Sequence, residues 1–123
     1  NSGQSAAFDA GFKTAVGEII VTLDSDLQNN PEDIPNLLSH IPEYDIVCGW
    51  RVKRQDSLVR KFSSRIANSI RNLFIKDGIH DTGCSLKAYK KEWLAKIKLY
   101  NGMHRFLPAL LQIEGARILE VEV

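Results

Sequence analysis

Hydrophobic residues along this chain fall into short uninterrupted runs and into helical stripes. The runs Ile19–Leu23 and Asp45–Gly49 are short and apolar, which predicts two strands buried on both faces. An Ala-rich stripe over Gln4–Ala15 and a segment with N-terminal capping signals over Pro31–His40 predict helices before and between these strands. The order favours a doubly wound α/β layer with right-handed crossovers.

The second half of the chain is richer in helical patterns. We expect further helices over Tyr89–Lys98 and His104–Ile113, and a closing strand over Arg117–Val123. Two parallel strands are too few for a stable doubly wound sheet, so we expect residues 1–123 to be one part of a domain truncated at both ends. A basic amphipathic helix is predicted over Ser57–Ile75 from an apolar stripe at helical spacing: Leu58, Phe62, Ile66, Ile70, Leu73 and Phe74.

Composition narrows the class of protein. The 123 residues are 44% hydrophobic and 25% charged, which is typical of a soluble globular chain of one domain's size. Cys48 and Cys84 are the only cysteines, and their apolar or small neighbours predict buried thiols and a reducing compartment. The sequence contains neither a signal-peptide pattern nor an apolar run of the length that a membrane span needs.

Positive charge is concentrated in one segment. Residues Arg51–Lys76 contain eight Lys or Arg and one acid, a net of +7, so the rest of the chain carries −6 of the formal total of +1. This asymmetry predicts an anionic partner. Aromatic residues do not interleave with the charges as they do in nucleic-acid platforms, so lipid headgroups at a membrane surface fit the segment better than nucleic acid.

The polar residues that end the first strand are the strongest chemical signal. Asp24, Asp26 and Gln28 alternate at its carboxyl end, where open α/β sheets bind their ligands. Two acids at this spacing can hold a hard divalent cation, which in turn neutralises a departing diphosphate, and the Gln28 amide oxygen offers a further ligand.

Three other interpretations compete for these acids. A haloacid-dehalogenase-like phosphatase has Thr or Val where Gln28 stands, and an EF-hand has Gly and Glu where Asn29 and Pro35 stand. Neither matches. The third alternative, that the acids only cap the following turn, stays open.

Four segments together resemble family-2 inverting glycosyltransferases, in the branch of dolichol-phosphate-mannose synthase and bacterial polyprenyl-phosphate glycosyltransferases. They are NSGQSAAFDAGFKTAVGEIIVTLDSDLQNNPEDIP, GWRVKRQDSLVRKFSSRIAN, DTGCSLKAY and HRFLPAL. The resemblance implies a Rossmann-like, three-layer nucleotide-diphospho-sugar transferase fold of the GT-A type. The chain would be the C-terminal portion of that catalytic domain, without its N-terminal strands.

Site residues follow from the resemblance position by position. It implies that Asp24, Asp26 and Gln28 serve the metal and the donor diphosphate, with Asp26 and Gln28 as direct ligands. The arginines and the serine matching the family pattern would bind phosphate groups, a role that suits guanidinium forks. They are Arg51, Arg60, Ser64 and, near the diphosphate, Arg105. For Arg60 the alternative is an ordinary solvated helix charge.

Asp81 matches an acid that the superfamily places near the acceptor. It would be a general base for a hydroxyl acceptor, but a lipid phosphate is already ionised, so Asp81 would then position the acceptor rather than deprotonate it. An ordinary turn aspartate before Gly83 is the alternative.

The resemblance also implies the reaction, its donor and acceptor, its metal and its location in the cell. We expect metal-dependent, inverting transfer of a hexose from a GDP- or UDP-linked sugar to a polyprenyl phosphate, with Mg²⁺ or Mn²⁺, in the cytoplasm at the inner face of the membrane. Two alternatives remain: a related transferase with a saccharide hydroxyl acceptor, and a non-catalytic domain that binds nucleotide or membrane.

Overall fold

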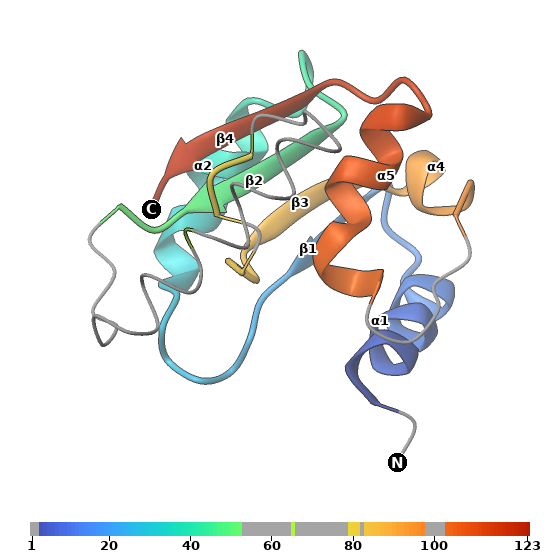
Figure 1. Ribbon diagram of the computed structural model, residues 1–123, viewed down its shortest axis with the longest axis horizontal. Coiled ribbons are helices and arrows are strands. Elements are labelled where there is room, and N and C mark those ends of the chain that lie inside the picture. The colour runs from blue at the N-terminus through green and yellow to red at the C-terminus, as the bar shows by residue number, and fades with distance from the viewer. Residues whose placement is uncertain (1–2, 53–64, 66–78, 82, 98–102) are drawn as a thin grey trace.

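A four-stranded mixed sheet forms the centre of the computed structural model, which describes residues 3–52, 65, 79–81, 83–97 and 103–123 (Figure 1). The strand order is β1-β3-β2-β4. β2 and β4 are parallel, whereas β3 is antiparallel to both of its neighbours. The strands are β1 (Ile19–Thr22), β2 (Ile46–Trp50), β3 (Lys87–Lys90) and β4 (Ile118–Glu122).

Short helices connect these strands. The predicted helices before β1 and between β1 and β2 are confirmed, although the second is divided into a 3-10 turn and an α-helix. Pro35 lies at the start of the α-helical part, where its missing N–H and its ring are tolerated. The helices whose bounds lie within the described residues are α1 (Gly3–Thr14), η1 (Pro31–Asp33), α2 (Ile34–Ser39), α4 (Lys91–Leu94), η2 (Met103–Phe106) and α5 (Leu107–Ile113).

The prediction of a helix over Tyr89–Lys98 is wrong at its start. Lys87–Lys90 forms β3, which lies between β1 and β2, and the helix that follows is only α4. Two lysines and an alanine carry little strand propensity, so the central position in the sheet decides the conformation. The predicted helix over Ser57–Ile75 lies outside the described residues apart from Arg65, which is helical.

Both faces of the sheet are covered, which makes three layers. On one face Tyr89 and Cys48 pack with Leu107 and Leu111 of α5, and Phe12 of α1 closes the cluster. On the opposite face Leu37 of α2 packs in a second cluster with Val47, Leu86 and Cys84. The two cysteines are buried free thiols, as predicted.

One edge of the sheet collects several loops. β1 and β2 end there, and β3 begins there because it runs in the opposite direction. The loop after β1, the residues after β2 and the residues before β3 therefore meet. Among the helices of the described residues, none has the length and apolar character to span a bilayer.

Candidate functional site

The segment after β1, here called the acidic loop (residues 24–29), is attached to the residue two places before β3. The Ser85 hydroxyl accepts a hydrogen bond from the backbone N–H of Asp24 at 3.0 Å and another from the Asn29 side-chain amide at 2.9 Å. Thr22, at the end of β1, donates its hydroxyl to the Ser85 carbonyl oxygen at 2.7 Å. Both ends of the acidic loop are thus held at one residue.

A tight turn shapes the middle of the acidic loop. The Asp26 carboxylate accepts the backbone N–H of Gln28 at 3.2 Å, and Leu27 between them has a φ of 65°. A left-handed backbone is uncommon for leucine and is concentrated at functional sites. Asp26 therefore does cap a turn, with one oxygen, while its side chain remains exposed.

Arg51 and Asp81 form a two-point ion pair beside this loop. Arg51 Nε donates to Asp81 Oδ2 at 2.8 Å, and Arg51 Nη2 donates to Oδ1 at 3.1 Å. The side chains are 13% and 6% exposed. The hydrogen bond to the Asp81 carboxylate raises the pKa of Arg51 above its ordinary value, and burial offsets only part of that rise. Gly83 leaves room for the fork, since a Cβ there would lie 3.2 Å from Arg51 Nη2.

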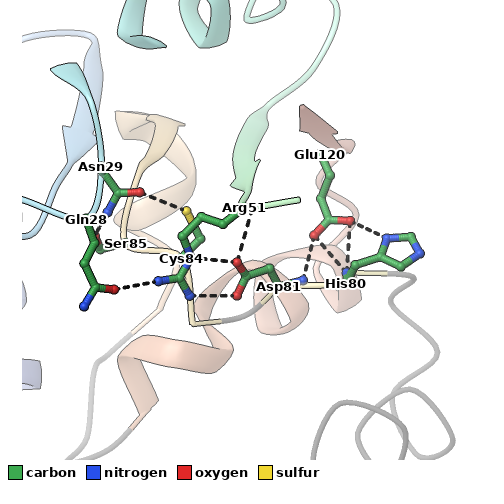
Figure 2. Close-up of polar contacts among 8 residues, drawn as sticks. All are labelled: Gln28, Asn29, Arg51, His80, Asp81, Cys84, Ser85 and Glu120. Carbon is green, nitrogen blue, oxygen red and sulfur yellow. Dashed lines mark hydrogen bonds and ion pairs between the residues drawn. The ribbon is translucent and has the colours of Figure 1, made fainter. Parts of the chain in front are cut away.

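The third nitrogen of Arg51 reaches the acidic loop. Arg51 Nη1 donates to the Gln28 Oε1 atom at 3.1 Å, so the guanidinium lies between Gln28 and Asp81 (Figure 2). The charge of Asp26 also contributes to the raised pKa of Arg51. A fixed cation therefore already interacts with the acidic loop.

Glu120 on β4 binds the far side of the Asp81 segment. Its carboxylate accepts the backbone N–H of His80 at 2.8 Å and that of Asp81 at 3.1 Å. The His80 ring lies 2.7 Å from the same carboxylate through Nδ1 and stacks on Trp50, with centroids 4.6 Å apart. Four segments distant in sequence thus form one polar network.

The structure brings most of the predicted site residues to one edge of the sheet. Arg105 is exposed in η2, and among the described residues it makes no hydrogen bond to the network. Arg60 and Ser64 lie outside the described residues. The residues that meet at the edge are Asp24, Asp26, Gln28, Arg51 and Asp81.

Sequence reasoning missed the residues that hold this arrangement. Ser85 and Asn29 are common loop residues, and Glu120 stands in a strand that sequence alone does not place beside Asp81. Lys87, for which the sequence offered no prediction, is the first residue of β3 and 5% exposed.

The donor atoms fit a hard divalent cation, but only as a partial ligand set. Asp24, Asp26 and Gln28 offer carboxylate and amide oxygens on one anchored loop, which is the chemistry that Mg²⁺ and Mn²⁺ prefer. Within the described residues, no group of three or more His, Cys, Asp or Glu side chains could hold a metal. A cation here would take its remaining ligands from water and substrate phosphates, as Mg²⁺ commonly does.

A groove among the described residues lies elsewhere. It has a volume of about 660 Å³ and opens at the amino end of β1, opposite to the acidic loop. Its lining is mainly apolar and includes Val16, Ile19, Leu38, Ile41 and Ala95. None of the network residues lines it.

An acidic loop and an arginine fork lie at the carboxyl ends of strands in a three-layer α/β sheet, which is where open α/β sheets bind their ligands. The family model described as "Glycosyl transferase family 2" matches residues 1–98. The chain belongs to this family, and the α/β transferase fold predicted from the sequence is confirmed.

Relatives with known names agree with this assignment. The chain is 43% identical over 128 residues to a dodecaprenyl-phosphate galacturonate synthase of Rhizobium johnstonii. It is 37% identical over 124 residues to an undecaprenyl-phosphate 4-deoxy-4-formamido-L-arabinose transferase of Pectobacterium atrosepticum. Each alignment covers 100% of this chain and 38% of the relative, so the chain spans well under half of their length.

One solved structure supports the fold independently of close sequence similarity. It is described as the crystal structure of a mycobacterial protein and superimposes with a TM-score of 0.71 at 18% identity. The match covers 98% of this chain and 42% of the other. At this identity the likeness concerns the fold alone.

Proposed function

We propose that the chain is part of the catalytic domain of a glycosyltransferase that moves a hexose from a nucleotide-diphosphate sugar to a polyprenyl phosphate, with inversion. The donor would be GDP- or UDP-linked, and the reaction would take place in the cytoplasm at the inner face of the membrane. Membership of the family and the names of two relatives support the general activity.

The arrangement of Arg51 between Gln28 and Asp81 is the observation that carries the proposal. A guanidinium held at this edge provides fixed N–H donors beside the predicted metal ligands. Such donors suit phosphate oxygens, and preorganised charge of this kind stabilises negative charge that develops during group transfer.

The acidic loop would hold Mg²⁺ or Mn²⁺ through Asp24, Asp26 and Gln28. The cation would supply Lewis-acid stabilisation of the departing nucleoside diphosphate. The chain's own contribution is positional: Ser85 and Asn29 fix the loop, and Arg51 lies at the Gln28 side chain before substrate arrives.

The hydrogen bonds and burial of Asp81 favour a phosphate acceptor over a saccharide hydroxyl. A general base needs a carboxylate oxygen that can reach and accept the acceptor's proton. Both oxygens of Asp81 instead accept hydrogen bonds from Arg51, and the residue is 5% exposed. A phosphate is already ionised, so Asp81 can act by holding Arg51 in place.

The test uses the full-length protein with undecaprenyl phosphate and a panel of UDP- and GDP-linked hexoses, measuring glycolipid and released nucleoside diphosphate. Asp26→Asn is the informative variant because asparagine can still accept the Gln28 N–H and cap the turn, but it is a poorer cation ligand. We expect it to lower kcat/KM about a hundredfold or more.

Asp33→Asn, in η1, is the matched control and should leave activity unchanged. Transfer that persists in Asp26→Asn with a chelator present would refute the metal role. Binding of nucleotide sugar without any released diphosphate would instead support a non-catalytic binding domain.

A further inference from the structure

The side chain of Glu120 accepts hydrogen bonds that strand pairing alone does not require. Its side chain is 10% exposed, and its two oxygens accept from the backbone N–H groups of His80 and Asp81. The Nδ1 atom of His80 also lies 2.7 Å from this carboxylate. Three nitrogens from the 80–81 segment thus converge on one side chain.

The peptide of Asp81 is therefore fixed from one side and its carboxylate from the other. Glu120 takes the backbone N–H, while the side chain of Asp81 takes both ends of the Arg51 fork. A shift of this peptide would displace the carboxylate from Arg51, and Arg51 would lose the contact that aims it at Gln28. Figure 2 shows the sequence of contacts from Glu120 through Asp81 and Arg51 to Gln28.

We propose that Glu120 is a positioning residue, which presets the Arg51–Asp81 pair for binding the diphosphate of a nucleotide; this inference rests on the proposed function. The matched family region ends at residue 98, so β4 and Glu120 lie beyond it. Substitution of a residue that supports a ligand-binding group usually lowers the affinity by about an order of magnitude, because the groups that contact the ligand lose their orientation.

The experiment compares Glu120→Gln with Glu122→Gln in the full-length protein. Glu122 is on the same strand, two residues later, and exposed, so the control has the same chemistry without the contacts. Binding of UDP and of GDP, each with Mn²⁺, is measured by titration calorimetry. Hydrogen exchange of the His80 and Asp81 amides and the thermal midpoint are measured on the same samples.

We expect Glu120→Gln to speed amide exchange at His80 and Asp81 and to weaken nucleotide binding about tenfold, with the control unchanged in both. KM for the sugar nucleotide should rise by the same factor, while kcat changes less. Glu120→Asp, whose shorter side chain keeps the charge but withdraws the oxygens, should act in the same direction and serves if the first variant does not fold.

Faster amide exchange in Glu120→Gln with unchanged nucleotide affinity would mean that Glu120 has only a structural role, and it would overturn the proposal. Unchanged amide exchange in this variant would also overturn it. Failure of the proposed function gives a different result. In that case the unmodified protein binds the nucleotide but releases no diphosphate, and the comparison of affinities still decides the role of Glu120.

Discussion

The Arg51 guanidinium donates two hydrogen bonds to the Asp81 carboxylate, from Nε at 2.8 Å and from Nη2 at 3.1 Å, across thirty positions of sequence. This geometry needs a planar fork, which arginine has and lysine lacks. The remaining Nη1 is thereby turned toward the acidic loop. The pair joins two loops, and it also holds the positively charged Arg51 guanidinium in place beside the acidic loop.

The first prediction concerns the stability of this pair. Asp81→Asn should lower the free energy of unfolding by about 3 kcal/mol, because it leaves a largely buried guanidinium without its counter-charge. Arg51→Gln should cost a similar amount, and the double variant should cost less than the sum of both. Urea titrations of the four proteins measure this coupling; additive losses would mean that the pair contributes nothing as a unit.

The second prediction concerns the anchor of the acidic loop. Ser85→Ala removes the acceptor for Asp24 N–H and Asn29 Nδ2, and we expect about tenfold weaker Mn²⁺-dependent nucleotide binding at a stability cost of about 1 kcal/mol. Ser39→Ala, which removes an exposed hydroxyl bonded within α2, is the control. Calorimetric titration would contradict the prediction if both variants bound equally well.

The third prediction is a dependence of stability on pH. Burial raises the pKa of Asp45, yet hydrogen bonds from the Arg117 backbone N–H and from Lys90 outweigh it and hold the pKa at about 2. The unfolded chain titrates near the ordinary value of about 4, so the carboxylate's contribution is complete above that pH and is lost as pH falls through 2.

This difference corresponds to about 2 kcal/mol of unfolding free energy. Asp45→Asn should therefore flatten the loss of stability between about pH 4 and pH 2, as followed by thermal melting across that range. Asp9→Asn removes an exposed i, i+4 pair with Lys13 and should leave the slope unchanged. An equal slope in the Asp45 variant and the unmodified protein would disprove the assignment.

The fourth prediction compares two glycines. A Cβ at Gly49 would lie 3.0 Å from the Leu86 carbonyl oxygen and 3.1 Å from Cys84 Sγ, so Gly49→Ala should destabilise by about 1–3 kcal/mol. Gly11 in α1 has open space, and Gly11→Ala should stabilise by about 0.5–1 kcal/mol. Opposite shifts in melting temperature are expected; a Gly49→Ala variant that melts no lower than the unmodified protein would show that packing at Gly49 is looser than described.

The sequence predicted the elements whose patterns are local. Continuous apolar runs identified β1 and β2, and the cap at Asn30, whose side chain accepts the Glu32 N–H, marked the start of η1. β3 could not be found in this way because Lys87 and Ala88 have low strand propensity. Its conformation depends on pairing with β1 and β2 on both sides, which is information from distant segments.

In the candidate site, too, the sequence predicted the residues that local patterns indicate and missed those that depend on distant segments. Asp24, Asp26 and Gln28 could be identified because they follow a predicted strand directly. The support from Glu120 could not, since nothing local indicates that β4 lies next to β2 and brings this carboxylate to the Asp81 peptide. The roles of Asp24, Asp26 and Gln28 in binding metal and phosphate remain predictions.

The reversed direction of β3 has a consequence for the stretch of chain between β2 and β3. β2 leaves the sheet and β3 enters it at one edge, so the stretch 51–86 has both of its ends beside the acidic loop. Strand pairing thus holds Arg51 at the start of this stretch and Ser85 near its end beside the acidic loop, whatever the length of chain between them.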